Sequence, residues 1–219
     1  MKLATLSLET VGAEPARKPG SRRFGWVLKP GVRVGFAVLV VSLFAASYTQ
    51  PLWVSRFVAP QYPYGLNLQV YLTRVAGDKE EVDLLNHYVG MRSIDKMATF
   101  ERRIALGALV GVCALALAAA FFRKSSWQFL FVLPLVLFPI GMLIDLYSWL
   151  WYAGHALDPD SALSMSIKEF TPKLIGTQKI ANFEVTSGLG AGAWLQLAAA
   201  VLLAGAAAVG WKLSREHAA

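Results

Sequence analysis

The chain has little of the chemistry on which most enzymes depend. Its 219 residues include one cysteine and three histidines. The lone Cys113 has no partner for an internal disulfide. Without a Cys-x-x-Cys pair, the chain has no means of attaching haem c, exchanging disulfides or building a cysteine-rich zinc site. The neighbours of Cys113 are apolar and disfavour the thiolate, so we interpret it as a packing residue.

Two further absences narrow the function. No histidine lies in a long apolar run, which excludes a bis-histidine haem b held between membrane helices of this chain. The sequence also contains no Walker A motif, no dinucleotide fingerprint and no Ser/His/Asp set at a recognisable spacing. We therefore expect no self-contained enzyme, and a copper oxygenase or quinone-reactive subunit is the least favoured interpretation.

Charge is scarce as well, since 16% of residues are charged and 56% are hydrophobic. The apolar residues gather in four runs, each close to the ~20 residues that cross a hydrocarbon core. Three of these runs hold no charged residue, and the other holds only Asp145. They predict transmembrane helices at residues 34–53, 104–122, 127–151 and 190–211. The first run follows a polar arm and lacks a small-residue cleavage site, so we expect an uncleaved anchor.

Lysine and arginine predict the orientation. Eleven of the 21 basic residues lie in the 45 residues of the arm 1–33, the short connection 123–126 and the tail 212–219. Only ten lie in the 88 residues of the two long loops. The positive-inside rule then places both termini in the cytoplasm of a bacterial inner membrane, and loop A (54–103) and loop B (152–189) in the periplasm. The net charge of +7 thus indicates topology and attraction to anionic membrane lipid, not binding of nucleic acid.

The expected fold class is an all-α membrane protein, a four-helix bundle with a small mixed α/β extracytoplasmic cap built from the two loops. In loop A, alternation predicts a strand whose buried face carries Leu66, Leu68, Val70 and Leu72. Helical spacing predicts a helix over Glu80–Val89, ended by Gly90, and a second short helix from Ser93. Loop B shows turn signals but little periodicity, which is typical of functional or partner-binding segments.

Histidine and methionine supply the candidate metal ligands. On a helix, His87 and Met91 are four residues apart and share a face, and imidazole and thioether are ligands that Cu(I) accepts. Met97 could join them through the break at Gly90. Loop B offers His155, Asp158 and Met165. From spacing alone, an alternative stays open in which His87 hydrogen-bonds loop B and Met91 fills a packing gap.

Asp145 is the one ionisable residue inside an apolar run, and such residues are functional candidates. It lies near an aromatic belt at the outer end of the third run. Two interpretations follow. In the first, Asp145 pairs with Arg102 or Arg103 at the membrane interface. In the second, Asp145 and Asp158 belong to a polar pocket that leads to the loop site.

Between Ala59 and Gly190 the sequence resembles a bacterial membrane-protein family found among the accessory genes of nitrous oxide reductase and its copper-handling lipoprotein. The resemblance rests on the segments "YPYGLNLQVY", "LLNHYVGM", "HALDPDSAL" and "FTPKLIGTQKIANF". It implies an accessory role in supplying copper or electrons to a periplasmic copper enzyme. It also implies that His87 and Met91 are copper ligands.

Two main hypotheses result. The first is a periplasm-facing copper-binding accessory protein with the ligand candidates His87, Met91, Met97 and His155. The second is a non-catalytic structural or anchoring subunit of a respiratory or other membrane complex. Small residues in the fourth run permit close contact between helices and favour the second hypothesis. Both predict other membrane or periplasmic subunits as partners.

Overall fold

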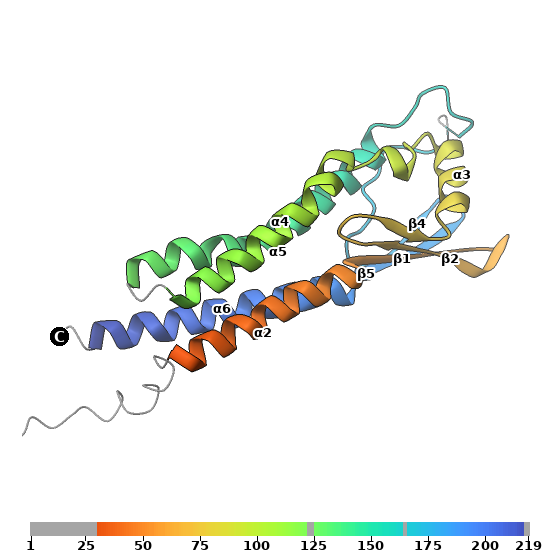
Figure 1. The fold of residues 1–219 in the computed structure, drawn as a ribbon. Coiled ribbons are helices and arrows are strands. Elements are labelled where there is room, and N and C mark those ends of the chain that lie inside the picture. Colours follow the sequence, from red (N-terminus) through yellow and green to blue (C-terminus); the bar gives the residue numbers. More distant parts are fainter. Residues whose placement is uncertain (1–29, 122–124, 164–165, 217–219) are drawn as a thin grey trace, which may run out of the picture.

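A computed structural model describes residues 30–121, 125–163 and 166–216. Four long helices run through it: α2 (Pro30–Thr49), α4 (Thr99–Phe121), α5 (Ser125–His155) and α6 (Ala191–Glu216). Helix α2 packs mainly on α4 and α6, and α5 packs on the same two helices, so the four close into a bundle (Figure 1). The basic arm up to residue 29, both charged residues of the short connection, the last three residues of the tail and Met165 lie outside the described residues.

All four helices are long and apolar enough to cross a membrane. Only 11% to 33% of each apolar window is buried inside the chain, so most of the apolar surface faces outward, as it does in a bilayer. The expectation of a multi-pass membrane protein is confirmed at this level. The helix bounds differ by a few residues from those expected. Helix α2 ends at Thr49, shortly before Pro51 and a strand, and α4 begins at Thr99, before the apolar run starts.

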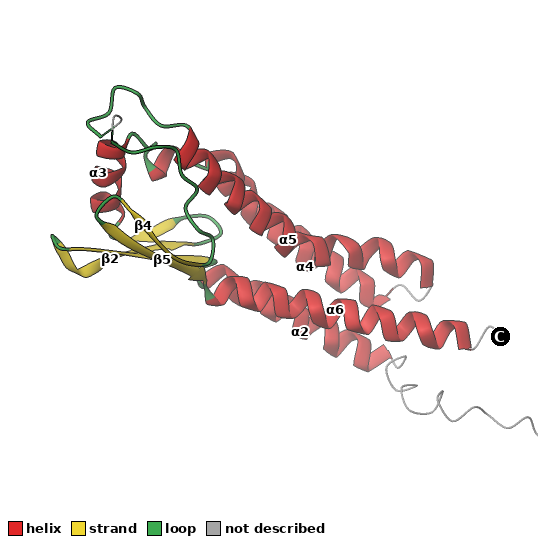
Figure 2. Cartoon of the chain, turned by 180° about the vertical axis from the view of Figure 1, so that it is seen from behind, coloured by secondary structure: helices red, strands yellow, loops and turns green. Residues whose placement is uncertain are grey.

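The expected all-α architecture with a small cap is wrong, because the two loops build a five-stranded antiparallel sheet (Figure 2). The order is β3-β2-β1-β5-β4. Strands β1 (Trp53–Ala59), β2 (Tyr62–Val70) and β3 (Val75–Gly77) come from loop A, and β4 (Gly176–Ile180) and β5 (Phe183–Leu189) from loop B. Strand β1 pairs with β5 from Trp53↔Leu189 to Val58↔Glu184, so the loops form one unit and the fold is α+β.

Three of the strands escape sequence reasoning for physical reasons. Strand β1 buries a polar residue, because the hydroxyls of Ser55 and Ser187 hydrogen-bond across the sheet at 2.9 Å, and this breaks the expected alternation. Strand β4 is a mostly polar edge strand. The β4–β5 hairpin turns at Ala181-Asn182 without glycine, because Ala181 itself takes a φ of 51° at the position where glycine is the usual signal.

Other local predictions are confirmed. Strand β2 buries Leu66 and Leu68 at 7% and 8% exposure, on the face that alternation predicts. Helix α3 (Lys79–Val89) ends at Gly90, whose φ of 88° is left-handed. The helix expected from Ser93 is instead a single 3₁₀ turn, η2 (Ile94–Lys96), followed closely by α4.

Two apolar cores hold these parts. One lies within the bundle and includes Val40, Phe44, Leu109, Leu135 and Ala199. The second lies between the sheet and α3, and its buried members are Trp53, Leu66, Leu68, Val82 and Ile94. The second core orients α3 and η2 over one face of the sheet.

Candidate functional site

A cavity of about 540 Å³ lies between the sheet, α3, η2 and the sheet-proximal ends of α4 and α5. Figures 1 and 2 both show α3 standing between the sheet and this end of the α4–α5 pair. The volume falls in the range of small-molecule sites. Apolar side chains make most of the wall, among them Trp53, Leu68, Val185, Ala108 and Phe138. Residues from both loops and from two membrane helices therefore share one site.

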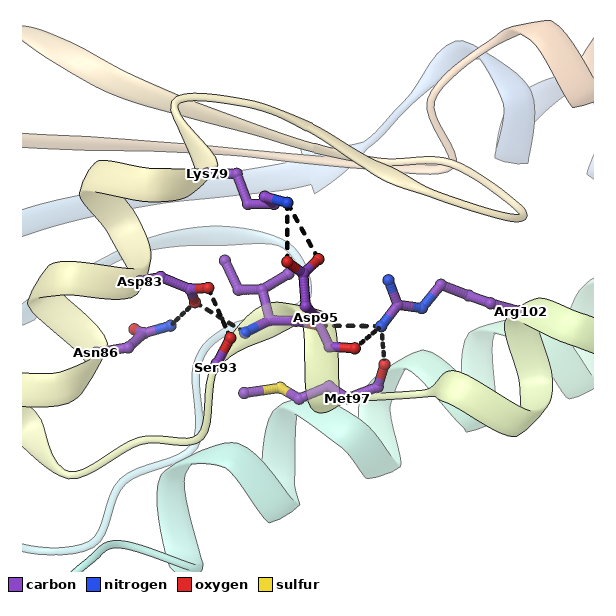
Figure 3. Close-up of polar contacts among 8 residues, drawn as sticks. Lys79, Asp83, Asn86, Ser93, Asp95, Met97 and Arg102 are labelled. Atoms are coloured by element: carbon purple, nitrogen blue, oxygen red, sulfur yellow. Dashed lines mark hydrogen bonds and ion pairs between the residues drawn. The ribbon is translucent and has the colours of Figure 1, made fainter.

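The segment between α3 and α4 is held in place by polar contacts (Figure 3). The Asp83 carboxylate on α3 accepts hydrogen bonds from the Ser93 hydroxyl and the Ile94 backbone N–H, both at 2.8 Å. At the start of α4, the Arg102 guanidinium donates to the carbonyl oxygens of Ile94, Asp95 and Met97. These bonds tie both ends of the segment to neighbouring helices, so the side chains that it turns into the cavity are positioned.

An ion pair reinforces the same segment from outside the membrane helices. The Lys79 ammonium lies 2.9 Å from an Asp95 carboxylate oxygen. The hydrogen bond to Asp95, and then the attraction of its charge, raise the pKa of Lys79 above its usual 10.5. Both groups are solvent-exposed, so the pair orients the segment more than it stabilises the fold.

His87 and Met91 do not share a helical face. The Met91 N–H donates to the Asn86 carbonyl at 2.8 Å and the Gly90 N–H to that of His87 at 3.3 Å, which is the Schellman arrangement that ends a helix. Met91 therefore leaves the register of α3. Its side chain lines the cavity. The His87 ring is exposed and meets Tyr88 edge-on, with ring centroids 6.3 Å apart.

Two other predicted residues, His155 at the end of α5 and Asp158 just after it, lie outside the cavity wall. The His155 ring stacks on Trp151 at 4.4 Å, and its Nδ1 lies 2.8 Å from the Trp151 carbonyl oxygen. If Nδ1 donates this hydrogen bond, Nε2 is left as the acceptor or ligand atom. Asp158 is exposed, and its backbone N–H donates to the Gly90 carbonyl at 2.8 Å. The two loops thus meet directly beside Met91.

The soft metal ligands that the cavity wall offers are methionine thioethers. Met91, Met97 and Met142 all line it, and they are the only methionines within the described residues. Within the same residues, no group of three or more His, Cys, Asp or Glu side chains could hold a metal ion. Sequence reasoning missed Met142 because it sits in an apolar run, where methionine carries no signal.

Asp145 also lines the cavity, from α5. No ion pair within the described part of the chain joins it to Arg102 or Arg103, and Arg102 is engaged by backbone carbonyls. The cavity carries a second carboxylate, Glu101 of α4. Sequence reasoning missed Glu101 because it adjoins two arginines at the end of an apolar run and reads as an ordinary interfacial charge.

Comparison with known proteins adds no family to this description. Neither the protein-family models nor the curated proteins that were searched match this chain. Function is therefore argued from the cavity itself, which presents thioethers, two carboxylates and an extended apolar wall.

Proposed function

We propose that the chain is a membrane accessory protein that binds Cu(I) in the methionine-lined cavity and passes it on for maturation of a periplasmic copper enzyme such as nitrous oxide reductase. The observation that carries this proposal is that Met91, Met97 and Met142 all line the same cavity. Thioethers are soft ligands that select Cu(I). The higher density of lysine and arginine in the arm, the short connection and the tail supports an orientation in which this end of the bundle faces the periplasm of a bacterial inner membrane.

The histidines have a separate part in this proposal. His87 is exposed on the last turns of α3, and the loops meet close by through the hydrogen bond between Asp158 and Gly90. An exposed imidazole four residues before Met91 suits an entry ligand, which takes copper from a donor before the thioethers receive it. His155, whose Nδ1 is engaged with a carbonyl, offers its Nε2 as a further ligand atom three residues before Asp158.

Copper binding by the purified full-length chain tests the proposal. Methionine also fills gaps in cores, so the variant must remove sulfur but keep volume. We expect the wild type to compete with a Cu(I) chelator such as bicinchoninate for about one equivalent of metal. The triple variant Met91→Leu/Met97→Leu/Met142→Leu should lose this binding, while leucine keeps the cavity wall apolar and of similar size.

A matched variant separates site loss from unfolding. Leu146→Met makes the opposite exchange, since it replaces a leucine of the same cavity wall on α5 by methionine at similar volume. This variant should retain copper binding.

His87→Ala should slow copper transfer from a donor but leave much of the affinity for copper. A folded wild type that binds no Cu(I) would refute the copper function.

A second candidate, a non-catalytic anchoring subunit, is favoured by the tip of the β1–β2 hairpin. Tyr64 is 90% exposed there, and its carbonyl oxygen accepts a hydrogen bond from Arg56 at 3.0 Å. Exposed tyrosine and arginine are frequent anchors of protein interfaces. If anchoring is the function, Tyr64→Ala should release a stoichiometric partner from native membranes, and the triple methionine variant should not.

A further inference from the structure

The cavity reaches from the sheet down into the membrane-spanning helices. Its α5 wall extends from Phe138 to Ala153, a span of about 22 Å at 1.5 Å per residue. Its α4 wall extends from Ala98, just before the helix, to Ala108. Much of this wall belongs to segments apolar enough to cross a membrane. A ligand with a long apolar tail drawn from the bilayer fits such a cavity better than a compact water-soluble one.

The polar groups of the wall are mostly satisfied within the chain. The hydroxyls of Ser55 and Ser187 bond each other, the Tyr71 hydroxyl donates to Gln69, and Arg102 donates to backbone carbonyls. Glu101 differs. Its Oε2 is buried and has no hydrogen-bond partner among the described residues. A buried acceptor without a donor is costly, so this oxygen marks the place where a ligand's donor belongs.

We propose that the cavity binds an isoprenoid hydroquinone of the membrane, with a ring hydroxyl donating to the Glu101 carboxylate and the tail lying along α4 and α5. Trp53, Phe57, Phe138 and Trp149 line the cavity and supply aromatic faces and edges to the ring. Asp145, on the facing helix, is a second acceptor. This inference concerns binding only and does not depend on the copper proposal.

The charges of the wall discriminate against a phospholipid. Its phosphate is an anion, and it would meet the carboxylates of Glu101 and Asp145. The guanidinium of Arg102 is already occupied by the carbonyls of Ile94 and Asp95. A hydroquinone is neutral and donates through its hydroxyls, so it meets the two carboxylates without repulsion. The observed lining therefore favours the quinol over an anionic lipid headgroup.

The test uses the full-length chain in phosphatidylcholine nanodiscs, with decylubiquinol kept reduced under anaerobic conditions as the probe. Trp53 and Trp149 line the cavity, so binding should quench tryptophan fluorescence saturably. Glu101→Gln should raise the dissociation constant about tenfold or more, the factor expected from losing one charge-assisted hydrogen bond. Glu184→Gln, an exposed glutamate on β5, is the matched control and should leave binding unchanged.

A second variant keeps the proposal testable if Glu101→Gln fails to fold. Ala108→Phe narrows the part assigned to the tail. It should weaken decylubiquinol at least tenfold and leave the binding of the corresponding tail-less hydroquinone unchanged. The triple methionine-to-leucine variant should still bind quinol, which separates this result from any failure of the copper proposal.

Three results would overturn the inference. The first is the absence of saturable quenching in the wild type. The second is a Glu101→Gln protein that binds as tightly as Glu184→Gln. The third is displacement of the quinol by phosphatidylglycerol at equal concentration, which would assign the cavity to a lipid.

Discussion

The two halves of the bundle differ in how closely they pack. In α6, 33% of the apolar window is buried, whereas in α5 the figure is 11%. The polar pair between α2 and α6 is fully enclosed, since Ser47 and Gln196 are both 0% exposed and the Gln196 amide donates to the Ser47 hydroxyl at 3.0 Å. The α4–α5 pair instead borders the cavity. The α2–α6 pair is therefore closely packed, whereas the α4–α5 pair leaves space for the cavity.

Glycine shows the same contrast at close range. A Cβ added to Gly192 at the start of α6 would lie 2.7 Å from the Gln50 carbonyl oxygen, and one on Gly190 would lie 2.2 Å from that of Pro51. A Cβ added to Gly107, Gly111 or Gly141 in α4 and α5 would meet nothing within 4 Å. Small residues are therefore required at Gly190 and Gly192, beside the sheet, and not at Gly107, Gly111 or Gly141. Gly154 near the end of α5 is also tightly enclosed, since a Cβ there would lie 1.8 Å from the Phe170 carbonyl oxygen.

The largest effect is expected where the two halves meet. Phe44 of α2 is 0% exposed and packs edge-on against Phe138 of α5, with centroids 6.1 Å apart. Phe44→Ala should lower the free energy of unfolding by about 3–5 kcal/mol, because it opens a cavity in a closed core. Ile144→Ala, at a position that is 61% exposed, is the control. Reversible unfolding in mixed micelles measures both, and equal losses would contradict the contrast between core and lipid-facing surface.

Glycine substitutions at two positions, one in α6 and one in α5, should give the next largest effect, with opposite signs. Gly192→Ala forces α6 away from the end of α2 and should cost about 1–3 kcal/mol. Gly141→Ala has free space and should gain up to about 1 kcal/mol, because alanine has the higher helix propensity. Thermal unfolding of both variants in the same detergent decides the point. A stable Gly192→Ala protein would mean that the two helices need no close contact.

The smallest effect concerns the ion pair between Lys79 and Asp95, which orients the segment beside the cavity. The raised pKa of Lys79, which follows from its hydrogen bond to Asp95, means that the pair's contribution to stability is fully present below the usual lysine pKa of 10.5. It is lost as the pH rises through the higher folded-state pKa. The difference in unfolding free energy between wild type and Lys79→Met should therefore be constant near neutral pH and shrink above pH 10.

A control fixes the interpretation of this pH profile. Lys96→Met removes a nearby lysine that has no ion pair within the described ranges, so its difference from wild type should show no such alkaline step. An identical step in both variants would assign the effect to general charge and not to the Asp95 contact.

Sequence reasoning reached the features that depend on neighbours along the chain. Leu66 and Leu68 alternate with polar residues and are buried on one face of β2. Gly90 ends α3 because only a residue tolerant of positive φ continues the turn. It failed where a residue's role depends on a distant partner. Ser55 is buried because Ser187, 132 residues away, satisfies its hydroxyl, and no local pattern announces such a pair.

The candidate site divides in the same way. Met91, Met97 and Asp145 were singled out from the sequence, and all three line the cavity. Met142 and Glu101 line it too, but in the sequence one looks like an ordinary apolar residue and the other like an interfacial charge. His87 and His155 were singled out and lie outside the cavity wall. The end of α3 at Gly90 turns the following segment inward and leaves His87 facing outward, whereas His155 stacks on Trp151 at the end of α5.

The sequence by itself determined the four helices that are long and apolar enough to cross a membrane, because length and apolarity are properties of a continuous segment. Each segment matches the thickness of the hydrocarbon core independently of the others. Only the tertiary structure decided that the two loops close into one sheet and that a cavity opens beneath it. Both depend on pairing between segments more than 100 residues apart, and the energy of such pairing comes from contacts that exist only once the chain has folded.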